Sequence, residues 1–316
     1  MFIIKHRAIF FAIAALLVGV SIVATAVFGI RPSIEFTGGT LIEIGYSGGR
    51  ADKAMLEEEF NALNIGAYSL RPFGDDAYLL RVRELTEQER TAVMSAATLD
   101  GVVKPELRRQ NTVGPTIGGE LQNKALVALA AVVLMTIIYV AFAFRQVSEP
   151  VSSWKYGLIA IITLVHDVAI PIGVFAVVGH YLGTAEADIL FVTALLTILG
   201  YSVNDTIVIF DRVRENLKKN LDDGVEENFE VAVGRSLEQT FVRSFNTSVT
   251  VLIVVVAILL FGGSATFYFA LALTAGVIAG TYSSLFLAAP LLVVANNMRK
   301  SSGQDVLKEG HKNKRT

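Results

Sequence analysis

The chain has 316 residues, of which 53% are hydrophobic and 18% charged, and its mean hydropathy is +0.55. This composition is too apolar for a soluble domain with a solvated surface, so it indicates a polytopic membrane protein. The chain contains no cysteine, which excludes disulfides, thiol chemistry and cysteine-based metal sites. The net charge of −2 carries little information because the charges are segregated along the chain.

Several apolar stretches are long enough, or nearly long enough, to cross a bilayer as helices. The first follows Lys5 and Arg7 and resembles a signal peptide, but its full spanning length favours an uncleaved anchor. The last contains Pro290, so we expect it to tilt, kink or end early. The predicted fold class is an all-α six-helix transmembrane bundle with a small α+β domain. The six predicted spans are residues 9–28, 125–144, 158–178, 189–210, 244–261 and 267–295.

The distribution of Lys and Arg predicts the orientation in the membrane. The two shortest loops, 179–188 and 262–266, contain neither residue, whereas the connections that alternate with them are basic. Basic flanks stay on the cytoplasmic side, so both termini are expected there. The predicted organisation is a cytoplasmic N-terminus and first span (1–30), an extracytoplasmic domain (31–124), five further spans (125–298) and a basic, disordered cytoplasmic tail (299–316).

The extracytoplasmic segment alone mixes strand and helix patterns. Alternating apolar residues predict strands, helical spacing predicts two helices, and Thr86 begins a capping-box sequence. The resulting order, β-α-β-β-α-β, is that of a ferredoxin-like domain. In chain order the elements are 40–46, 51–63, 68–71, 77–83, 86–97 and 102–108.

The connection between the fourth and fifth spans has an apolar residue at every fourth position among charged ones, from Val225 to Phe241. This pattern predicts an amphipathic helix. Two arrangements remain open: the helix lies along the membrane surface, or it caps the bundle.

Asp205 lies within an apolar run that is long enough to span the membrane. A carboxylate in hydrocarbon costs at least ~2.5 kcal/mol, so an intramembrane Asp is expected to have a partner, water or a function. Thr193, Thr197, Tyr201 and Asn204 lie close to the same helix face as Asp205. We expect this polar stripe to face the interior of the bundle.

The neighbouring spans carry similar stripes. Thr163, His166 and Asp167 form one in the third span, and Arg243 begins another in the fifth, with Asn246 or Thr247 and Thr250. Three polar stripes on consecutive spans cannot all face lipid, so we expect the three helices to turn them toward one shared interior.

Asp205 precedes Asp211, where the apolar run ends, by six residues, or about 9 Å of helix. The Arg243 side chain can therefore reach towards it from the same side. We hypothesise that Asp205 binds and releases a proton with Arg243 as its counter-charge. The alternative is a static buried ion pair. For the third span, either His166 relays protons or Asp167 simply holds the imidazole in a polar pocket.

Gly276 and Gly280 form a Gly-x-x-x-Gly motif in the sixth span. Small residues at this spacing indicate close helix packing, within the bundle or with a partner.

On specific motifs the chain resembles the SecD/SecF family of bacterial protein-export subunits, within the resistance-nodulation-division superfamily, and its SecF branch in particular. Glu35 stands where the family usually has Asp, and Ser244 where Thr is common. The motifs that carry the resemblance are Phe36-Thr37-Gly38-Gly39-Thr40, Val113-Gly114-Pro115, Val165-His166-Asp167, Gly200 to Asn216, and Arg243 ahead of Asn246-Thr247-Ser248.

The resemblance implies a non-enzymatic role with no catalytic residue, cofactor or metal, in which protons are the coupling ion. It implies pairing with SecD, association with the SecYEG translocon of the SecA-dependent pathway, and contact with the translocating unfolded polypeptide and membrane lipids. Nucleic acid is not an expected partner. The expected location is the bacterial cytoplasmic (inner) membrane, where proton motive force promotes late steps of export. By motif, Asp205 and Arg243 match family positions implicated in proton passage.

Three other functions fit parts of the sequence. A proton-driven exporter of lipids or small molecules shares the bundle, and a passive scaffold needs only its packing. An intramembrane aspartyl protease needs two carboxyls that share a proton, here Asp167 and Asp205. The Gly-Tyr-Ser-Val-Asn-Asp sequence that ends at Asp205 differs from the Gly-x-Gly-Asp of such enzymes, which disfavours the protease.

Overall fold

The computed structural model describes residues 2–143, 153–182 and 185–298, so the predicted tail lies outside the described residues. The chain divides into two compact units. The helical unit comprises the described residues of Met1–Val27, Leu129–Phe175 and Thr193–Thr316, and the sheet unit comprises those of Phe28–Ala128 and Ala176–Val192.

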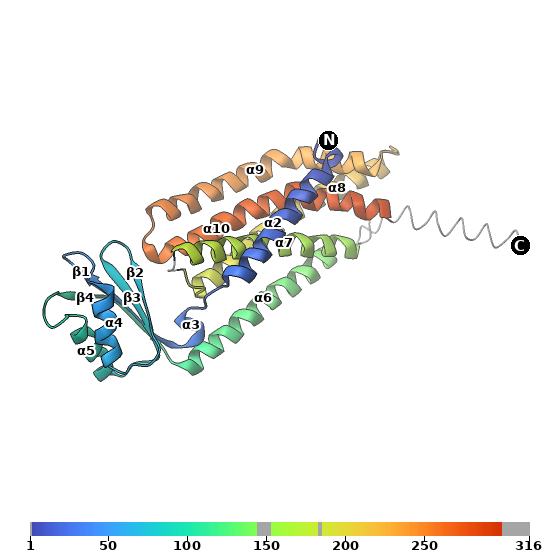
Figure 1. The fold of residues 1–316 in the computed structure, drawn as a ribbon. Helices are drawn as coiled ribbons and strands as arrows, with labels where there is room; N and C mark the ends of the chain where they lie inside the picture. Colours follow the sequence, from blue (N-terminus) through green and yellow to red (C-terminus); the bar gives the residue numbers. More distant parts are fainter. Residues whose placement is uncertain (1, 144–152, 183–184, 299–316) are drawn as a thin grey trace, which may run out of the picture. The chain divides into compact units, whose positions relative to one another are not determined.

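Six helices of the described chain are long and apolar enough to cross a membrane, as predicted (Figure 1). A short helix, α1 (Phe2–Lys5), precedes them. Three of the six, the second, fourth and fifth, extend past their apolar runs into charged sequence. The first five spanning helices are α2 (Arg7–Phe28), α6 (Pro115–Ala143), α7 (Ser153–Leu182), α8 (Ile189–Asp222) and α9 (Phe229–Phe261), and the sixth begins with α10 (Ser264–Ser283).

The sixth span does not end early at Pro290. After α10 the chain forms a π-helical segment, η1 (Ser284–Ala288), and then remains helical to Met298. Proline lacks an amide hydrogen, and its ring clashes with the carbonyl one turn earlier. The wider π turn directly before Pro290 accommodates this defect locally.

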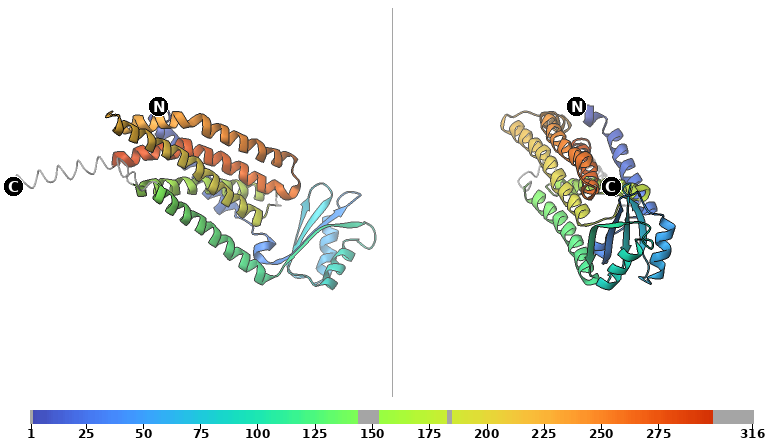
Figure 2. Two further views of the ribbon diagram at one scale, coloured as in Figure 1. Left: turned by 180° about the vertical axis from the view of Figure 1, so that it is seen from behind. Right: turned by 90° about the vertical axis from the view of Figure 1, so that its left-hand side faces the viewer.

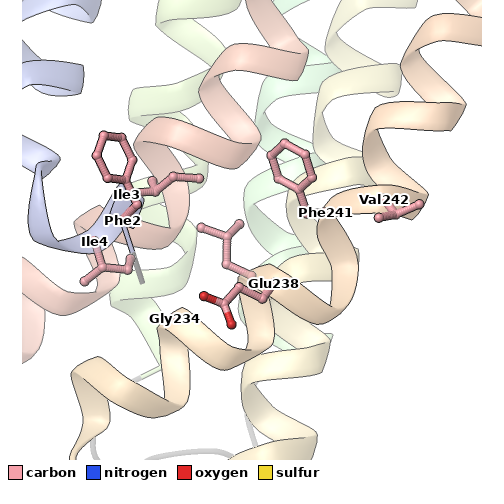
Figure 3. A pocket seen from close by; sticks show the side chains of 8 residues that line it. Phe2, Ile3, Ile4, Gly234, Glu238, Phe241 and Val242 are labelled. Atoms are coloured by element: carbon pink, nitrogen blue, oxygen red, sulfur yellow. The ribbon is translucent and has the colours of Figure 1, made fainter.

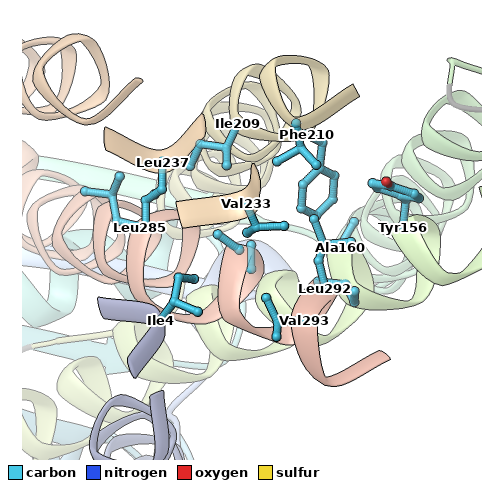
Figure 4. Packing of buried hydrophobic residues seen from close by; sticks show 14 of the residues in the cluster. Ile4, Tyr156, Ala160, Ile209, Phe210, Val233, Leu237, Leu285, Leu292 and Val293 are labelled. Carbon is cyan, nitrogen blue, oxygen red and sulfur yellow. The ribbon is translucent and has the colours of Figure 1, made fainter. Parts of the chain in front are cut away.

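An apolar core joins helices of the helical unit (Figure 4). The Phe210 ring of α8 meets Tyr156 of α7 edge-on, with ring centroids 5.2 Å apart. Phe229, Val233 and Leu237 are buried in the same cluster. The amphipathic sequence from Phe229 onwards is therefore the beginning of α9, capped by the Asn228 side chain, and it packs against the bundle, which is the second of the two arrangements considered. Val225, where the predicted helix began, lies outside α9 and is exposed.

The sheet unit contains an antiparallel sheet with strand order β2-β3-β1-β4, and the chain order is the predicted β-α-β-β-α-β. Helices α4 and α5 lie on one face of the sheet (Figures 1 and 2) and bury a common apolar core with it. Thr86 and Glu89 form the predicted capping box at the start of α5. The elements are β1 (Gly39–Tyr46), α4 (Lys53–Ala62), β2 (Ser69–Phe73), β3 (Ala77–Val82), α5 (Glu87–Ala96) and β4 (Pro105–Val113).

Two features of this unit differ from the prediction. The last strand runs to Val113 because it pairs with β1 as far as the Gly39–Val113 register position. Its polar end has no apolar alternation to reveal it, as expected for a strand at a sheet edge. A one-turn helix, α3 (Ile34–Thr37), also precedes β1 and is capped by Ser33.

Candidate functional site

Asp205 lies on the buried side of α8 with 6% of its surface exposed. Its Oδ2 atom is buried and has no hydrogen-bond partner. The side chains that act on this carboxyl are Ser244 and Arg243, which are adjacent on α9. The Ser244 hydroxyl is itself buried and, with no other hydrogen-bond partner, is placed to donate to this carboxyl. The Asp205 carboxyl is therefore buried, and one of its oxygens accepts no hydrogen bond. Such an arrangement is suited to gaining and losing a proton.

Arg243 acts on Asp205 through space as an opposite charge, and no ion pair joins the two side chains. Arg243 is exposed whereas Ser244 is buried. Successive residues on a helix differ in direction by about 100°, so only one of this pair can face α8. Arg243 thus lies near Asp205, as predicted, but the residue of α9 that faces inward is Ser244.

The polar stripes are arranged differently from the prediction. Thr193, Thr197 and Asn204 of α8 are exposed on this chain, and so are Asn246, Thr247 and Thr250 of α9. The expectation that all of them face an interior within this chain is wrong. The inward side of α9 instead carries the small hydroxyl residues Ser236, Thr240, Ser244 and Ser248.

Small hydroxyl residues suit this position because they allow two helices to approach closely and can bond their own backbone. Ser248 donates to the Ser244 carbonyl oxygen at 2.9 Å, and the Tyr201 hydroxyl of α8 donates to Ser248 Oγ at 2.7 Å. The four-residue spacing of these hydroxyls is visible in the sequence. The prediction of the inward face of α9 was based instead on the ionisable Arg243, which lies on the neighbouring face.

A second buried carboxylate, Asp167, joins three helices. Its Oδ1 atom lies 2.8 Å from His166 Nδ1, and its Oδ2 atom accepts hydrogen bonds from Ser202 of α8 and from Ser283 of α10, the latter at 2.8 Å. The His166 ring also stacks on Tyr282 with centroids 5.9 Å apart, and its buried Nε2 atom has no partner. Asp167 therefore contacts the imidazole, and the two alternatives for this pair, a proton relay or a polar pocket for His166, both stay predictions.

Ser202 and Ser283 were not predicted as site residues. Each lies three residues from a feature that was predicted, Asp205 and Gly280 respectively. Because both Asp167 oxygens are bonded to His166, Ser202 or Ser283, they are not paired with Asp205 as the carboxyls of an aspartyl protease must be.

A polar cavity of about 350 Å³ lies beside the Asp205 region. Arg243 lines it, and so does Val208, which is one helical turn from Asp205 on α8. The remaining lining residues are Asp211, Arg212, Glu215, Gln239 and Thr240. Asp205 itself does not line this cavity, and the first polar lining residue after it on α8 is Asp211, six residues further along the helix.

A separate cavity of about 260 Å³ lies between α1 and α9 (Figure 3). Its lining is apolar apart from Glu238, and it includes none of the predicted site residues. Among the described residues, no group of three or more His, Asp or Glu side chains is arranged to hold a metal ion.

Comparison with known proteins agrees with this architecture. Residues 94–298 match the family model "Protein export membrane protein SecD/SecF, C-terminal", and residues 23–49 match the SecD/SecF GG motif. The chain is 37% identical to the protein translocase subunit SecF of Thermobaculum terrenum, covering 93% of this chain and 94% of that protein. It is also 37% identical to the SecF subunit of Synechocystis, covering 88% and 89% respectively.

The crystal structure of SecDF from Thermus thermophilus, described as a translocon-associated membrane protein, is similar with a TM-score of 0.76 and 30% identity. The match covers 93% of this chain and 38% of that one. The chain thus corresponds to a little over a third of the solved SecDF polypeptide. A chain with six candidate membrane spans among its described residues, a four-stranded sheet unit and these matches over most of its length belongs to the SecD/SecF family of protein-export membrane proteins, in its SecF branch.

Proposed function

We propose that the chain, together with a SecD partner, uses proton motive force to promote late steps of polypeptide export through the SecYEG translocon. In this proposal the chain resides in the bacterial inner membrane with both termini in the cytoplasm and the sheet domain outside. It contacts the emerging unfolded polypeptide and the surrounding lipids, and it follows the ATP-driven action of SecA.

The buried Asp205 carboxyl, with its unpartnered Oδ2 atom, is the observation that carries the proposal. A permanently charged carboxylate without a hydrogen bond at that oxygen is costly, whereas a carboxyl that is protonated for part of a cycle is not. In this proposal the proton exchanges with water at the polar cavity that Arg243 lines.

Other predicted site residues take supporting roles in this proposal. Asn204 and Arg243 are exposed on this chain, so they contribute to the pathway on a surface that the SecD partner covers. His166 and Asp167 set the positions of α7, α8 and α10 around the acid through the hydrogen bonds to Ser202 and Ser283. Protons, and no bound cofactor, are the coupling species.

Substitution of Asp205 by Asn tests the proposal. The amide keeps the size of the carboxyl but cannot carry the proton, so we expect gradient-driven export and proton uptake to be lost together. The measurements are translocation of a secretory precursor into inverted vesicles with and without a proton gradient, and quenching of a pH-sensitive acridine dye in the same vesicles. Asp205→Glu, which keeps a titratable group, is expected to retain part of both activities.

Asp222→Asn is the matched control, because it makes the same change at an exposed position at the end of the same helix. It is expected to behave as the wild type. Normal gradient-dependent export by Asp205→Asn, at normal abundance and with SecD still bound, contradicts the proposal and favours a scaffold.

A further inference from the structure

The segment between α2 and β1 is bonded to the loop that leads into α8. Pro32 and Ala187 form a parallel bridge, in which the Ser33 amide donates to the Ala187 carbonyl and the Ala187 amide donates to the Arg31 carbonyl, both at 2.8 Å. These residues all belong to the sheet unit. The exit of the first span and the start of the fourth are therefore held together by backbone hydrogen bonds.

Glu35 caps α8. Its Oε2 atom accepts a hydrogen bond from the amide of Ile189, the first residue of that helix, at 2.7 Å. Asp188 supplies a second cap by accepting from the Phe191 amide at 2.8 Å. Burial raises the pKa of Asp188, and the nearby charge of Glu35 acts in the same direction. Two acidic side chains at a helix start are favourable because the first amides lack intrahelical partners and carry partial positive charge.

Arg81 connects this pairing to the centre of the sheet. From β3, its guanidinium donates to the Pro32 carbonyl at 2.9 Å, to Thr37 Oγ1 at 2.8 Å and to Glu186 at 3.2 Å. One side chain thus contacts both the segment after α2 and the loop before α8. The planar guanidinium suits this role because it presents several donors in a fixed geometry.

The two glycines after α3 bring the start of α6 to the same place. Gly38 has a positive φ of 72°, and a Cβ atom there lies 2.7 Å from Pro115 Cα. A Cβ atom on Gly39, whose φ is 124°, lies 2.6 Å from the Val82 carbonyl oxygen. Only glycine combines such backbone angles with so close an approach.

We propose that this junction, comprising residues 31–39, Arg81 and residues 186–189, is the mechanical coupling that transmits movement of α8 to the outer domain. The inference rests on the proposed function, because it presumes that proton exchange at Asp205 moves α8. Within it, Glu35 and Arg81 are positioning residues and take no part in proton transfer.

The continuity of α8 supports this role. The helix runs without proline from Ile189, which Glu35 caps, through Asp205 to Asp222. The sixteen residue steps from Ile189 to Asp205 (205 − 189) correspond to about 24 Å of helix. A continuous helix of this length moves as one body, so a displacement near Asp205 is carried to its capped end.

The test separates proton movement from export. Glu35→Ala and Arg81→Ala, each in the complete chain co-expressed with SecD, are expected to retain proton uptake by inverted vesicles within about two-fold. Glu35→Ala is expected to lower gradient-driven stimulation of export by about five-fold, a factor of the size that loss of one helix cap produces. Arg81→Ala, which removes the contacts to Pro32, Thr37 and Glu186, is expected to lower it to a similar extent. Glu35→Gln keeps an acceptor oxygen and is expected to restore most of the stimulation. Glu58→Ala, at an exposed position on α4, is the control and is expected to match the wild type.

The outcomes distinguish this inference from the proposed function. Wild-type export by both Glu35→Ala and Arg81→Ala overturns the coupling role, and so does a parallel loss of proton uptake and export at normal abundance. Failure of Asp205→Asn to change proton uptake instead overturns the proposed function, whatever the junction variants do.

A cross-link provides a second test, because the chain has no native cysteine. A transmitting junction must remain closed, so a disulfide between cysteines in Pro32→Cys/Ala187→Cys is expected to leave export unchanged. Loss of export on oxidation, restored by reductant, shows instead that the junction must open and contradicts the inference.

Discussion

Asp167 shows how one buried side chain can organise a membrane site. Its carboxylate receives hydrogen bonds from α8 and α10 and contacts the imidazole beside it on α7. In a bilayer, such bonds replace the hydrophobic driving force between helices, which is absent there. Asp167 therefore holds helices of the site together, whereas proton exchange at Asp205 belongs to the proposed function.

Replacing Asp167 tests this division of roles. Asp167→Ala leaves Ser202, Ser283 and His166 without their shared acceptor and is expected to lower the stability of the purified protein by about 3 kcal/mol. Asp167→Asn keeps one acceptor oxygen and is expected to cost about half as much. Thermal unfolding in detergent, followed by tryptophan fluorescence, measures both. An unchanged midpoint in Asp167→Ala contradicts the structural role.

Among the elements, α8 and α10 approach each other closely at two glycines of α10. A Cβ atom on Gly276 lies 2.1 Å from Ile198 Cδ1, and one on Gly280 lies 3.1 Å from Ser202 Cβ. Thr206 of α8 and Ser284, the first residue of η1, also share a hydrogen bond of 2.9 Å. The predicted close helix packing of the Gly-x-x-x-Gly motif is confirmed within the bundle.

This contact predicts opposite effects for two glycine substitutions. Gly276→Ala must displace Ile198 and is expected to destabilise the protein by about 1–3 kcal/mol. Gly200→Ala, on the exposed side of α8 with nothing within 4 Å of its Cβ, is expected to be neutral or to stabilise by up to about 1 kcal/mol through helix propensity. Their unfolding midpoints in detergent provide the comparison, and equal midpoints contradict the packing argument.

Across the molecule, burial differs strongly between the spanning helices. In the apolar 18-residue stretch of each span, 67% of the residues are buried in the last span and only 6% in α6. Within the described chain, the last span is therefore central and α6 peripheral. The exposed faces of α8 and α9 differ from that of α6 because they carry polar side chains. A polar face is unfavourable against lipid, so we expect the SecD partner to cover it.

Single-cysteine labelling tests this expectation without background, since the chain has no cysteine. Thr197→Cys and Asn246→Cys are expected to react with a maleimide when the chain is purified alone in detergent and to be protected when it is purified with SecD. Asp223→Cys, exposed beyond the end of α8, is the control and is expected to react in both samples. Equal reactivity of Asn246→Cys in the two samples contradicts burial of this face by SecD.

The six spans and the β-α-β-β-α-β order were predictable from sequence, because hydrophobic length and periodicity are local properties. The close helix packing at Gly276 and Gly280, and the position of Asp205 within a spanning helix, were predictable for the same reason. Which face of each helix points inward was not predictable. Ser244 faces inward where Arg243 was expected, and Ser202 and Ser283 donate hydrogen bonds to Asp167. Nor did any local pattern show that Glu35 caps a helix 154 residues away. These arrangements depend on the rotation of packed helices and on partners distant in sequence, which are decided only when the whole chain has folded.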